Sequence, residues 1–290
     1  MSLREAFASG KFAISVEFGP PKGVDVGEVL EAAEVLRGRV DAANVTDQQS
    51  AVMRLGSLAT CLLLKKKGLE PVFQLTCRDR NRIALQSDLL SAYVLGIENI
   101  LCLTGDYVSL GDHPQAKPVF DLDSISLLRT VKRLEEGYDL AGMELQGAPK
   151  FFAGAVVNPG AEPLEPQIMK MEKKVQAGAQ FFQTQAVYEP DKFAAFMARV
   201  EYLKVPVMVG IVPLKSAGMA RFMNENIAGI NVPEELIEEM SKTTRETRTQ
   251  KGIEIAARLI REMKDLCQGV HIMPIGWEKN VPAILDATGL

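Results

Sequence analysis

The chain has 290 residues, of which 47% are hydrophobic and 24% are charged. This composition is typical of a globular protein and argues against a disordered, collagen-like or coiled-coil chain. Lys and Arg total 33 against 37 Asp and Glu, which gives a formal charge of −4. No basic surplus favours nucleic acid or anionic lipid, so we expect neither nucleic acid nor a membrane as a partner.

The four cysteines are scattered, with no C-x-x-C pair and no histidine at metal-ligand spacing. The sequence therefore predicts no metal site, neither a structural zinc nor an iron–sulfur cluster. Free thiols indicate a reducing compartment. The N-terminal stretch has no long apolar segment, and no run reaches about 18 apolar residues, so we expect a soluble, cytoplasmic protein.

Short apolar, β-branched runs recur along the chain, and each ends in a small or polar residue. Segments with helical periodicity lie between them. The eight runs that we predict as strands are 12–18, 40–46, 71–77, 99–105, 151–157, 180–185, 205–212 and 270–276.

Strict alternation of buried strands and helices requires parallel pairing with right-handed crossovers. Eight units of roughly 30 residues predict a closed (β/α)8 barrel, an α/β fold that forms a single domain over residues 1–290. The competing fold is an open doubly wound sheet. That fold usually carries G-x-G-x-x-G after an early strand, and the motif is absent here, so the barrel is favoured.

Two insertions interrupt the regular spacing. Residues 106–123 form a Gly- and Pro-rich loop after the fourth strand, and residues 214–250 contain two extra helical stretches. One of these stretches opens with Pro233, which we place in its first turn. Long loops on a rigid barrel usually carry function.

The active site of such a barrel lies at the C-terminal ends of its strands. The polar residues that close the apolar runs are therefore the candidates, and they form a site rich in amides and hydroxyls with few charges. These residues are Glu17, Thr46 with Asp47, Gln74 with Thr76, Thr104 with Asp106, Asn158 and Gln185.

Glu17 stands in the apolar run ISVEFGPP, where a carboxylate is costly unless it is paired or protonated. A protonated carboxyl group is what proton delivery to a substrate nitrogen needs. The alternative is a structural ion pair between Glu17 and a Lys or Arg at the mouth of the barrel. Position alone does not decide between the two interpretations.

Asp106 and Gln185 have equally balanced alternatives. Asp106 follows Gly105, which permits close backbone approach to a ligand, but it could instead cap a helix or hold a turn. Gln185 could read the edge of a heterocycle or be a satisfied core amide. His113 in the loop and His271 in the last strand are expected to be exposed or structural rather than acid–base groups.

The strand ends together resemble the methylenetetrahydrofolate reductase family, a family of flavoprotein barrels, from about residue 10 to the C-terminus. Each segment is weak alone, but together and in order they are specific. The segments are SVEFGPPKG at 15–23, NVTD at 44–47, QLTCRDRNRIALQSDLL at 74–90, LCLTGD at 101–106, KKVQAGAQFFQTQ at 173–185 and GIVPL at 210–214.

The resemblance implies reduction of 5,10-methylenetetrahydrofolate to 5-methyltetrahydrofolate. It implies that Glu17 is the general acid, that Asp106 lies between flavin and pterin, and that Gln185 contacts the pterin ring. The implied cofactor is FAD, with FMN as the alternative. The implied cofactor-binding positions are Thr46, Gln74, Thr104, Gly105, Asp106, Phe120, Asp123, Asn158 and Lys174.

Some positions depart from the family. Gln74 and Asn158 stand where members have histidines, Thr104 replaces an arginine, and Ala217 replaces a phenylalanine. These changes leave two alternatives open, a barrel subunit without turnover and a pterin-dependent methyltransferase. An aldolase is disfavoured because no strand end offers a lysine for a Schiff base.

The resemblance also bears on partners. The expected substrate is a tetrahydrofolate, and the expected electron donor is NAD(P)H or, through a partner subunit, ferredoxin. The CRDRN run resembles a branch of the family that works in one-carbon complexes. We therefore expect an oligomer or a part of a complex.

Overall fold

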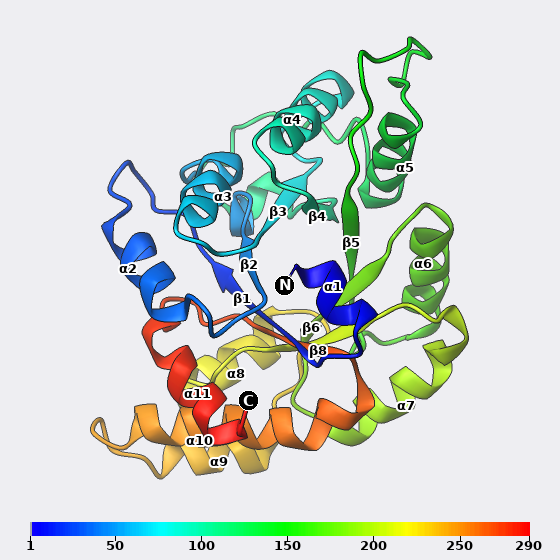
Figure 1. The fold of residues 1–290 in the computed structure, drawn as a ribbon. Helices are drawn as coiled ribbons and strands as arrows, with labels where there is room; N and C mark the ends of the chain where they lie inside the picture. Colours follow the sequence, from blue (N-terminus) through cyan, green and yellow to red (C-terminus); the bar gives the residue numbers. More distant parts are fainter. Residues whose placement is uncertain (1) are drawn as a thin grey trace.

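The computed structural model describes residues 2–290, in which eight parallel strands close into a barrel surrounded by helices (Figure 1). The strands pair in chain order, and β8 closes the sheet by pairing with β1. The predicted (β/α)8 barrel is confirmed, and each predicted strand overlaps an observed one. The strands are β1 (Ala13–Phe18), β2 (Ala42–Val45), β3 (Pro71–Thr76), β4 (Asn99–Leu103), β5 (Phe152–Val157), β6 (Phe181–Ala186), β7 (Val207–Ile211) and β8 (Gly269–Ile272).

A helix covers the outside of the barrel after each strand. These helices are α2 (Gly27–Leu36), α3 (Ser57–Lys66), α4 (Arg82–Val94), α5 (Ser124–Glu135), α6 (Glu165–Gln176), α7 (Pro190–Val200), α10 (Arg248–Met263) and α11 (Val281–Thr288). The predicted extra helices are α8 (Ala217–Asn226) and α9 (Glu234–Ser241). Pro233 is the N-cap of α9, one position earlier than predicted, because its fixed φ suits the extended residue that precedes a helix.

The barrel has a floor that the sequence did not reveal. Helix α1 (Leu3–Ala8) lies across the N-terminal end of the barrel, where Leu3 and Ala6 are fully buried (Figure 1). They pack on an inner layer that includes Phe152, Phe181 and Met208. A helix of six residues is too short to show a convincing period, which is why sequence periodicity missed it.

Polar side chains fill the layer of the barrel interior next to this apolar floor. Asn44 and Gln183 exchange hydrogen bonds between their amides, with N···O distances of 2.8 and 3.1 Å. Ser15 and His271 lie in the same layer, and all four side chains are buried. Barrel interiors are usually packed with branched apolar residues, so this polar layer requires that each member find a partner.

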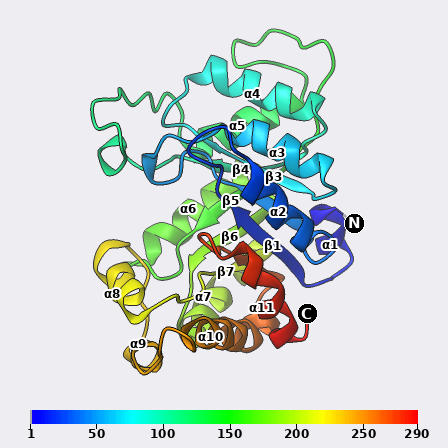
Figure 2. The same ribbon diagram turned by 90° about the vertical axis from the view of Figure 1, so that its left-hand side faces the viewer.

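With one end closed by α1, the C-terminal ends of the strands form the accessible end. In Figure 2, α1 lies at one end of the barrel and α8 at the other. The 106–123 loop contains the short helix η2 (Val108–Leu110) and approaches η1 (Gln49–Ala51), the turn after β2. Over residues 2–290, no helix is both long enough and apolar enough to span a bilayer.

Candidate active site

Two adjoining cavities open at the C-terminal ends of the strands. The first cavity, of about 380 Å³, lies between the ends of β1 to β5 and helices α5 and α6. The second cavity, of about 210 Å³, lies toward β5, β6 and β8. Glu17, Gln74, Leu103 and Val156 line both cavities and form their common wall. Of the predicted site residues, the first cavity gathers Glu17, Thr46, Gln74, Thr104, Gly105, Asp106, Asp123 and Lys174.

Glu17 is held by neutral side chains. Its Oε2 accepts a hydrogen bond from Gln74 Nε2 at 3.2 Å, and its Oε1 accepts one from Gln49 Nε2 at 3.4 Å. The nearest basic atom is His271 Nε2, 3.7 Å from Oε2. Within residues 2–290, no Lys or Arg pairs with this carboxyl group, so the structural ion pair considered above is not formed.

His271 is a neighbour of Glu17 that the sequence analysis did not identify. Its Nδ1 lies 2.8 Å from the hydroxyl of Ser15, which confirms a structural hydrogen bond, but its other nitrogen faces Glu17. Ser15 also accepts a hydrogen bond from Gln183 Nε2 at 3.3 Å, so His271 is joined to the buried polar layer on one side and approaches Glu17 on the other.

The signal that could have identified His271 is the closure of the barrel. Strand β8 pairs with β1, and His271 lies opposite Ser15, two residues before Glu17. Residues two apart on a strand share a face, so Ser15, Glu17 and the position opposite Ser15 point into the same interior.

Asp106 anchors a strained turn at the rim of the first cavity. Its Oδ2 accepts a hydrogen bond from the backbone N–H of Ser50 at 3.0 Å. Gln48, Ser50 and Ala51 in this turn have φ of 51°, 55° and 57°, a left-handed region that is costly for residues with side chains. The buried guanidinium of Arg78 supports the turn by donating to the carbonyls of Gln48 and Asp106.

Asp47, another strand-end residue, has a structural role. Its fully buried carboxylate accepts hydrogen bonds from the backbone and hydroxyl of Thr76 and two from Arg80, at 2.7 and 3.2 Å. Asp88 on α4 pairs with the other side of Arg80 at 2.9 Å. This cluster fixes the ends of β2 and β3 beside the cavity.

Two groups in the first cavity are suited to hold a polar ligand. The hydroxyl of Thr46 is buried and has no hydrogen-bond partner among residues 2–290. The ammonium group of Lys174 donates to the carbonyl of Val156 at 2.7 Å, and burial, followed by the charge of Lys170, lowers its pKa to about 8. A bound acceptor gives the hydroxyl a hydrogen-bond partner and offsets the free-energy cost of burying the cation.

Gln185 and Asn158 line the second cavity rather than the first. The Oε1 of Gln185 accepts from the N–H of Ala186 at 2.9 Å, which leaves its Nε2 free to donate. The amide of Asn158 is already used, because it donates to Ala228 and accepts from Gly160. Of the other predicted cofactor positions, only Gln74 lines the same cavity as Asn158, and the amide of Asn158 joins the end of β5 to the segment after α8.

Phe120 also lies outside the first cavity. It lines a third cavity, of about 670 Å³, and packs edge-on against Tyr107 with ring centroids 5.9 Å apart. This cavity adjoins the first one, because Thr104, Gly105 and Asp123 line both.

Thr104, Gly105 and Asp123, which line both of these cavities, also fix the conformation of the local backbone. Asp123 caps α5 by accepting from the N–H of Ser126 at 2.7 Å, and the hydroxyl of Thr104 accepts from the N–H of Ser124 at 3.1 Å. Gly105 has φ of 97°, which a residue with a side chain rarely adopts. Asp123 rather than Asp106 caps this helix, whereas Asp106 holds a turn, which was the other structural alternative considered above.

A barrel whose accessible end carries a carboxyl group, amides and hydroxyls around adjoining cavities is typical of an enzyme that acts on a small polar molecule. The family model described as methylenetetrahydrofolate reductase matches residues 2–289, and the chain belongs to this family.

Relatives and solved structures agree with this assignment. Methylenetetrahydrofolate reductase 2 of Schizosaccharomyces pombe is 27% identical over 310 residues, covering 100% of this chain and 47% of the relative. Methylenetetrahydrofolate reductase (NADH) 1 of Zea mays is 25% identical over 310 residues, covering 99% of this chain and 50% of the relative. The chain thus spans about half the length of these curated relatives.

A solved structure has the same fold. It is described as an uncharacterized protein from Clostridium thermocellum that binds two copies of 5-methyl-5,6,7,8-tetrahydrofolic acid. It superimposes with a TM-score of 0.68 at 16% identity and covers 99% of both chains.

Proposed function

We propose that this chain reduces 5,10-methylenetetrahydrofolate to 5-methyltetrahydrofolate with flavin as the hydride donor. Family membership supports the reaction class. The observation that carries the proposal is the position of Glu17 in the wall common to the first and second cavities. A carboxyl group placed there can face a cofactor on one side and a substrate on the other.

The residues of the first cavity fit a flavin. The unpartnered hydroxyl of Thr46, the amide of Gln74 and the ammonium of Lys174 offer polar contacts to a heterocycle with several acceptor atoms. Thr104, Gly105, Asp106 and Asp123 complete this binding surface. A bound flavin supplies the two-electron chemistry that none of these side chains provides.

FAD is the proposed form of the flavin. The third cavity adjoins the first at Thr104, Gly105 and Asp123, and its Phe120 and Tyr107 offer aromatic surface. FAD can use both cavities, whereas FMN needs only the first.

Glu17 is the proposed general acid. It donates a proton to a pteridine nitrogen and so assists opening of the methylene-bridged ring. Its contacts with Gln74 and Gln49 keep the carboxyl group at the cavity wall, and Nε2 of His271 lies 3.7 Å from Oε2. The chain holds this group in place before substrate binds, which lowers the entropic cost of the reaction.

Gln185 and Asp106 are the proposed substrate contacts. Gln185 has a free amide donor in the second cavity, where it can read the edge of the pteridine. Asp106 places a negative charge at the rim of the first cavity, where it favours a cationic form of the substrate.

NAD(P)H is the proposed electron donor, because the Zea mays relative is named as an NADH enzyme. The alternative donor is reduced ferredoxin delivered by a partner subunit.

The experiment that tests the function is an anaerobic titration of the purified protein reconstituted with FAD. 5-Methyltetrahydrofolate should reduce the flavin. In separate titrations, one of NADH, NADPH or reduced ferredoxin should also reduce it. Reconstitution with FMN, run in parallel, should give weaker binding. A protein that retains neither flavin contradicts the proposal.

A second candidate is a barrel that binds methyltetrahydrofolate without reducing it. The Clostridium thermocellum protein, whose description names two bound copies of methyltetrahydrofolate, supports this candidate. The two functions differ in one measurement, because the second predicts binding of methyltetrahydrofolate by a protein that carries no flavin.

A further inference from the structure

The turn at residues 48–51, which follows β2, contacts two carboxyl groups of the candidate active site. The side-chain amide of Gln49 donates to Oε1 of Glu17, with an N···O distance of 3.4 Å. The backbone N–H of the next residue, Ser50, donates to Oδ2 of Asp106 at 3.0 Å. Glu17 lies on β1 and Asp106 follows β4, and these strands are not neighbours in the barrel. The turn therefore joins two groups that the sheet keeps apart.

The backbone of this turn is strained, and the core does not fix it. Gln48, Ser50 and Ala51 have positive φ angles, and residues with side chains keep such angles only where surrounding contacts impose them. Gln49 and Ser50 are exposed. Gln48 lines the first cavity and also a further cavity of about 360 Å³. The turn thus forms part of a wall between two cavities, and its conformation depends on a few specific contacts.

Residues 106–113, which we call the strap, contact the turn at Gly111. A Cβ atom added at Gly111 would overlap the carbonyl group of Ala51 and lie 2.9 Å from its Cβ. The φ of Gly111 is −100°, which any residue can adopt. Glycine is therefore required at this position for close approach to the turn and not for its backbone angle.

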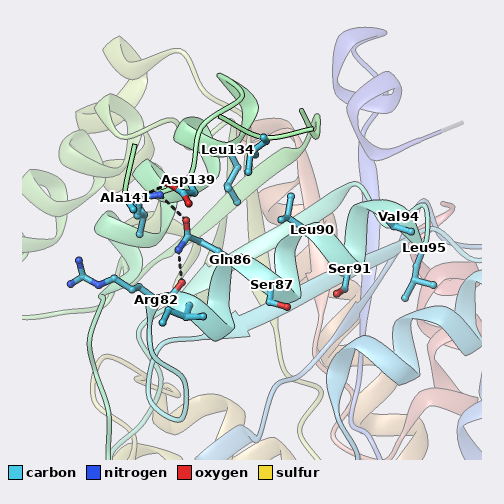
Figure 3. Close-up of a pocket in the computed structure, with 13 residues that line it drawn as sticks. Arg82, Gln86, Ser87, Leu90, Ser91, Val94, Leu95, Leu134, Asp139 and Ala141 are labelled. Atoms are coloured by element: carbon cyan, nitrogen blue, oxygen red, sulfur yellow. Dashed lines mark hydrogen bonds between the residues drawn. The ribbon is translucent and has the colours of Figure 1, made fainter. Parts of the chain in front are cut away.

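The strap is anchored by charged groups. The carboxylate of Asp112 accepts from the N–H of Met53 at 3.1 Å and forms an ion pair with Lys22. The loop that continues from the strap is held by Arg82, at the start of α4, whose Nε and Nη2 donate to Asp121 at 2.9 and 2.8 Å. Figure 3 shows Arg82 at the edge of a groove on the outer wall of the barrel, with its guanidinium directed away from the other residues of the groove. These anchors oppose movement of the strap away from the turn.

We propose that the turn and the strap fix the orientation of the carboxyl group of Glu17, with Gln49 as the positioning residue. Oε2 of Glu17 is held by Gln74, whose side chain is buried on β3. A carboxyl group held at one oxygen can still rotate about its last side-chain bond, because such torsions are broad. The contact from Gln49 to Oε1 removes this freedom and sets the direction in which the oxygens give or take a proton. The inference rests on the proposed function, in which Glu17 is the general acid.

Single-turnover reduction of the flavin-loaded protein by 5-methyltetrahydrofolate tests the role of Gln49. Gln49→Met keeps the length of the side chain but cannot donate, so the limiting rate constant should fall by about 10-fold. The Kd for the folate and the affinity for flavin should change little. Gln49→His retains an N–H at a similar reach and should recover part of the loss. An unchanged rate constant in Gln49→Met, or a parallel loss of flavin affinity, would overturn the inference.

A second variant tests the strap from outside the cavities. Gly111→Ala introduces the Cβ that collides with Ala51 and should cause the same selective fall in the rate constant. Gly23→Ala is the matched control, because a Cβ at Gly23 meets no atom within 4 Å apart from its chain neighbours, and it should behave as the wild type. The double variant Gln49→Met/Gly111→Ala should be no slower than the slower single variant, because both changes remove the same contact. Additive losses, or an unaffected Gly111→Ala variant, would overturn the role of the strap.

The wild type separates this inference from the proposed function. A wild type that binds flavin but is not reduced by 5-methyltetrahydrofolate contradicts the proposed function and the role of Gln49 with it. A wild type that is reduced no faster than Gln49→Met and Gly111→Ala contradicts the role of Gln49 alone. Circular dichroism checks that the variants fold, and Gln49→Met, which changes no backbone contact, decides the question if Gly111→Ala does not.

Discussion

The Nε2 atom of His271 lies 3.7 Å from Oε2 of Glu17, although the two residues are separated by almost the whole chain. Closure of the barrel between β8 and β1 creates this proximity. The histidine is in turn fixed by Ser15 and, through it, by Gln183 and Asn44. The proposed acid thus rests on a connected set of buried polar groups rather than on a single ion pair.

The Glu17→Gln variant tests the proposed acid. Glutamine keeps the size and the hydrogen-bonding capacity of the side chain but cannot transfer a proton, so folate turnover should fall by about 10² to 10⁴-fold. Reduction of the flavin by its donor should be largely unaffected. Rapid-mixing measurements of the two half-reactions separate these effects, and equal loss of both would contradict the role of Glu17.

His271 is predicted to be a positioning residue for Glu17. His271→Phe should lower the folate half-reaction by roughly 10-fold, because it removes the polar group 3.7 Å from Oε2 of Glu17 and leaves the buried hydroxyl of Ser15 without this partner, a loss of about 1 kcal/mol or more. His271→Gln, which can still donate toward Oε2, should recover part of the loss. Flavin affinity should not change in either variant, and a parallel loss of flavin would indicate a merely structural role.

The buried hydroxyl of Thr46 is predicted to lower the stability of the flavin-free protein and to increase its affinity for flavin. Thr46→Val removes a buried hydroxyl without a partner, so the free energy of unfolding without flavin should rise by about 1–3 kcal/mol. Flavin affinity should fall at the same time. Thr60→Val is the control, because its hydroxyl donates to the carbonyl of Gly56 at 3.3 Å and its removal should destabilise the protein. Denaturant unfolding and flavin fluorescence measure the two quantities, and unchanged flavin affinity would argue against Thr46 as a ligand contact.

Lys174 should give the unfolding free energy a defined pH dependence. Burial lowers its pKa from 10.5 to about 8 in the folded chain, so the unfolded state binds more protons between these values. Stability without flavin should therefore rise as the pH increases from about 8 to 10.5. Lys174→Met should lack this rise and should be more stable than the wild type at neutral pH. Identical pH profiles for the two proteins would show that the lysine is well solvated.

Asp47 is predicted to be essential for stability. Asp47→Ala leaves the largely buried guanidinium of Arg80 with Asp88 as its remaining partner, so the variant should lose about 3–5 kcal/mol of unfolding free energy. Asp121→Ala, which breaks the more exposed pair with Arg82, should cost at most about 1 kcal/mol. Urea unfolding compares the two variants, and similar losses would contradict the structural role of Asp47.

Local patterns were sufficient to predict the barrel. Each strand carries its own continuous apolar run, and the helical periods between the strands dictate the crossovers, so the eightfold repeat is visible without any long-range information. The same reasoning located most of the candidate site, because the last polar residue of each apolar run lies at the accessible end. Helix α1 was missed because its burial depends on the barrel that it closes.

The sequence by itself determined the repeat, the end of the barrel that carries the polar residues and the family to which the chain belongs. Only the tertiary structure decided how those residues are shared among neighbouring cavities, that Asn158 and Phe120 do not line the first cavity, and that His271 faces Glu17. The physical reason is that strand ends are set by local hydrophobicity, whereas distances across a closed barrel depend on the register of pairing between strands far apart in the chain.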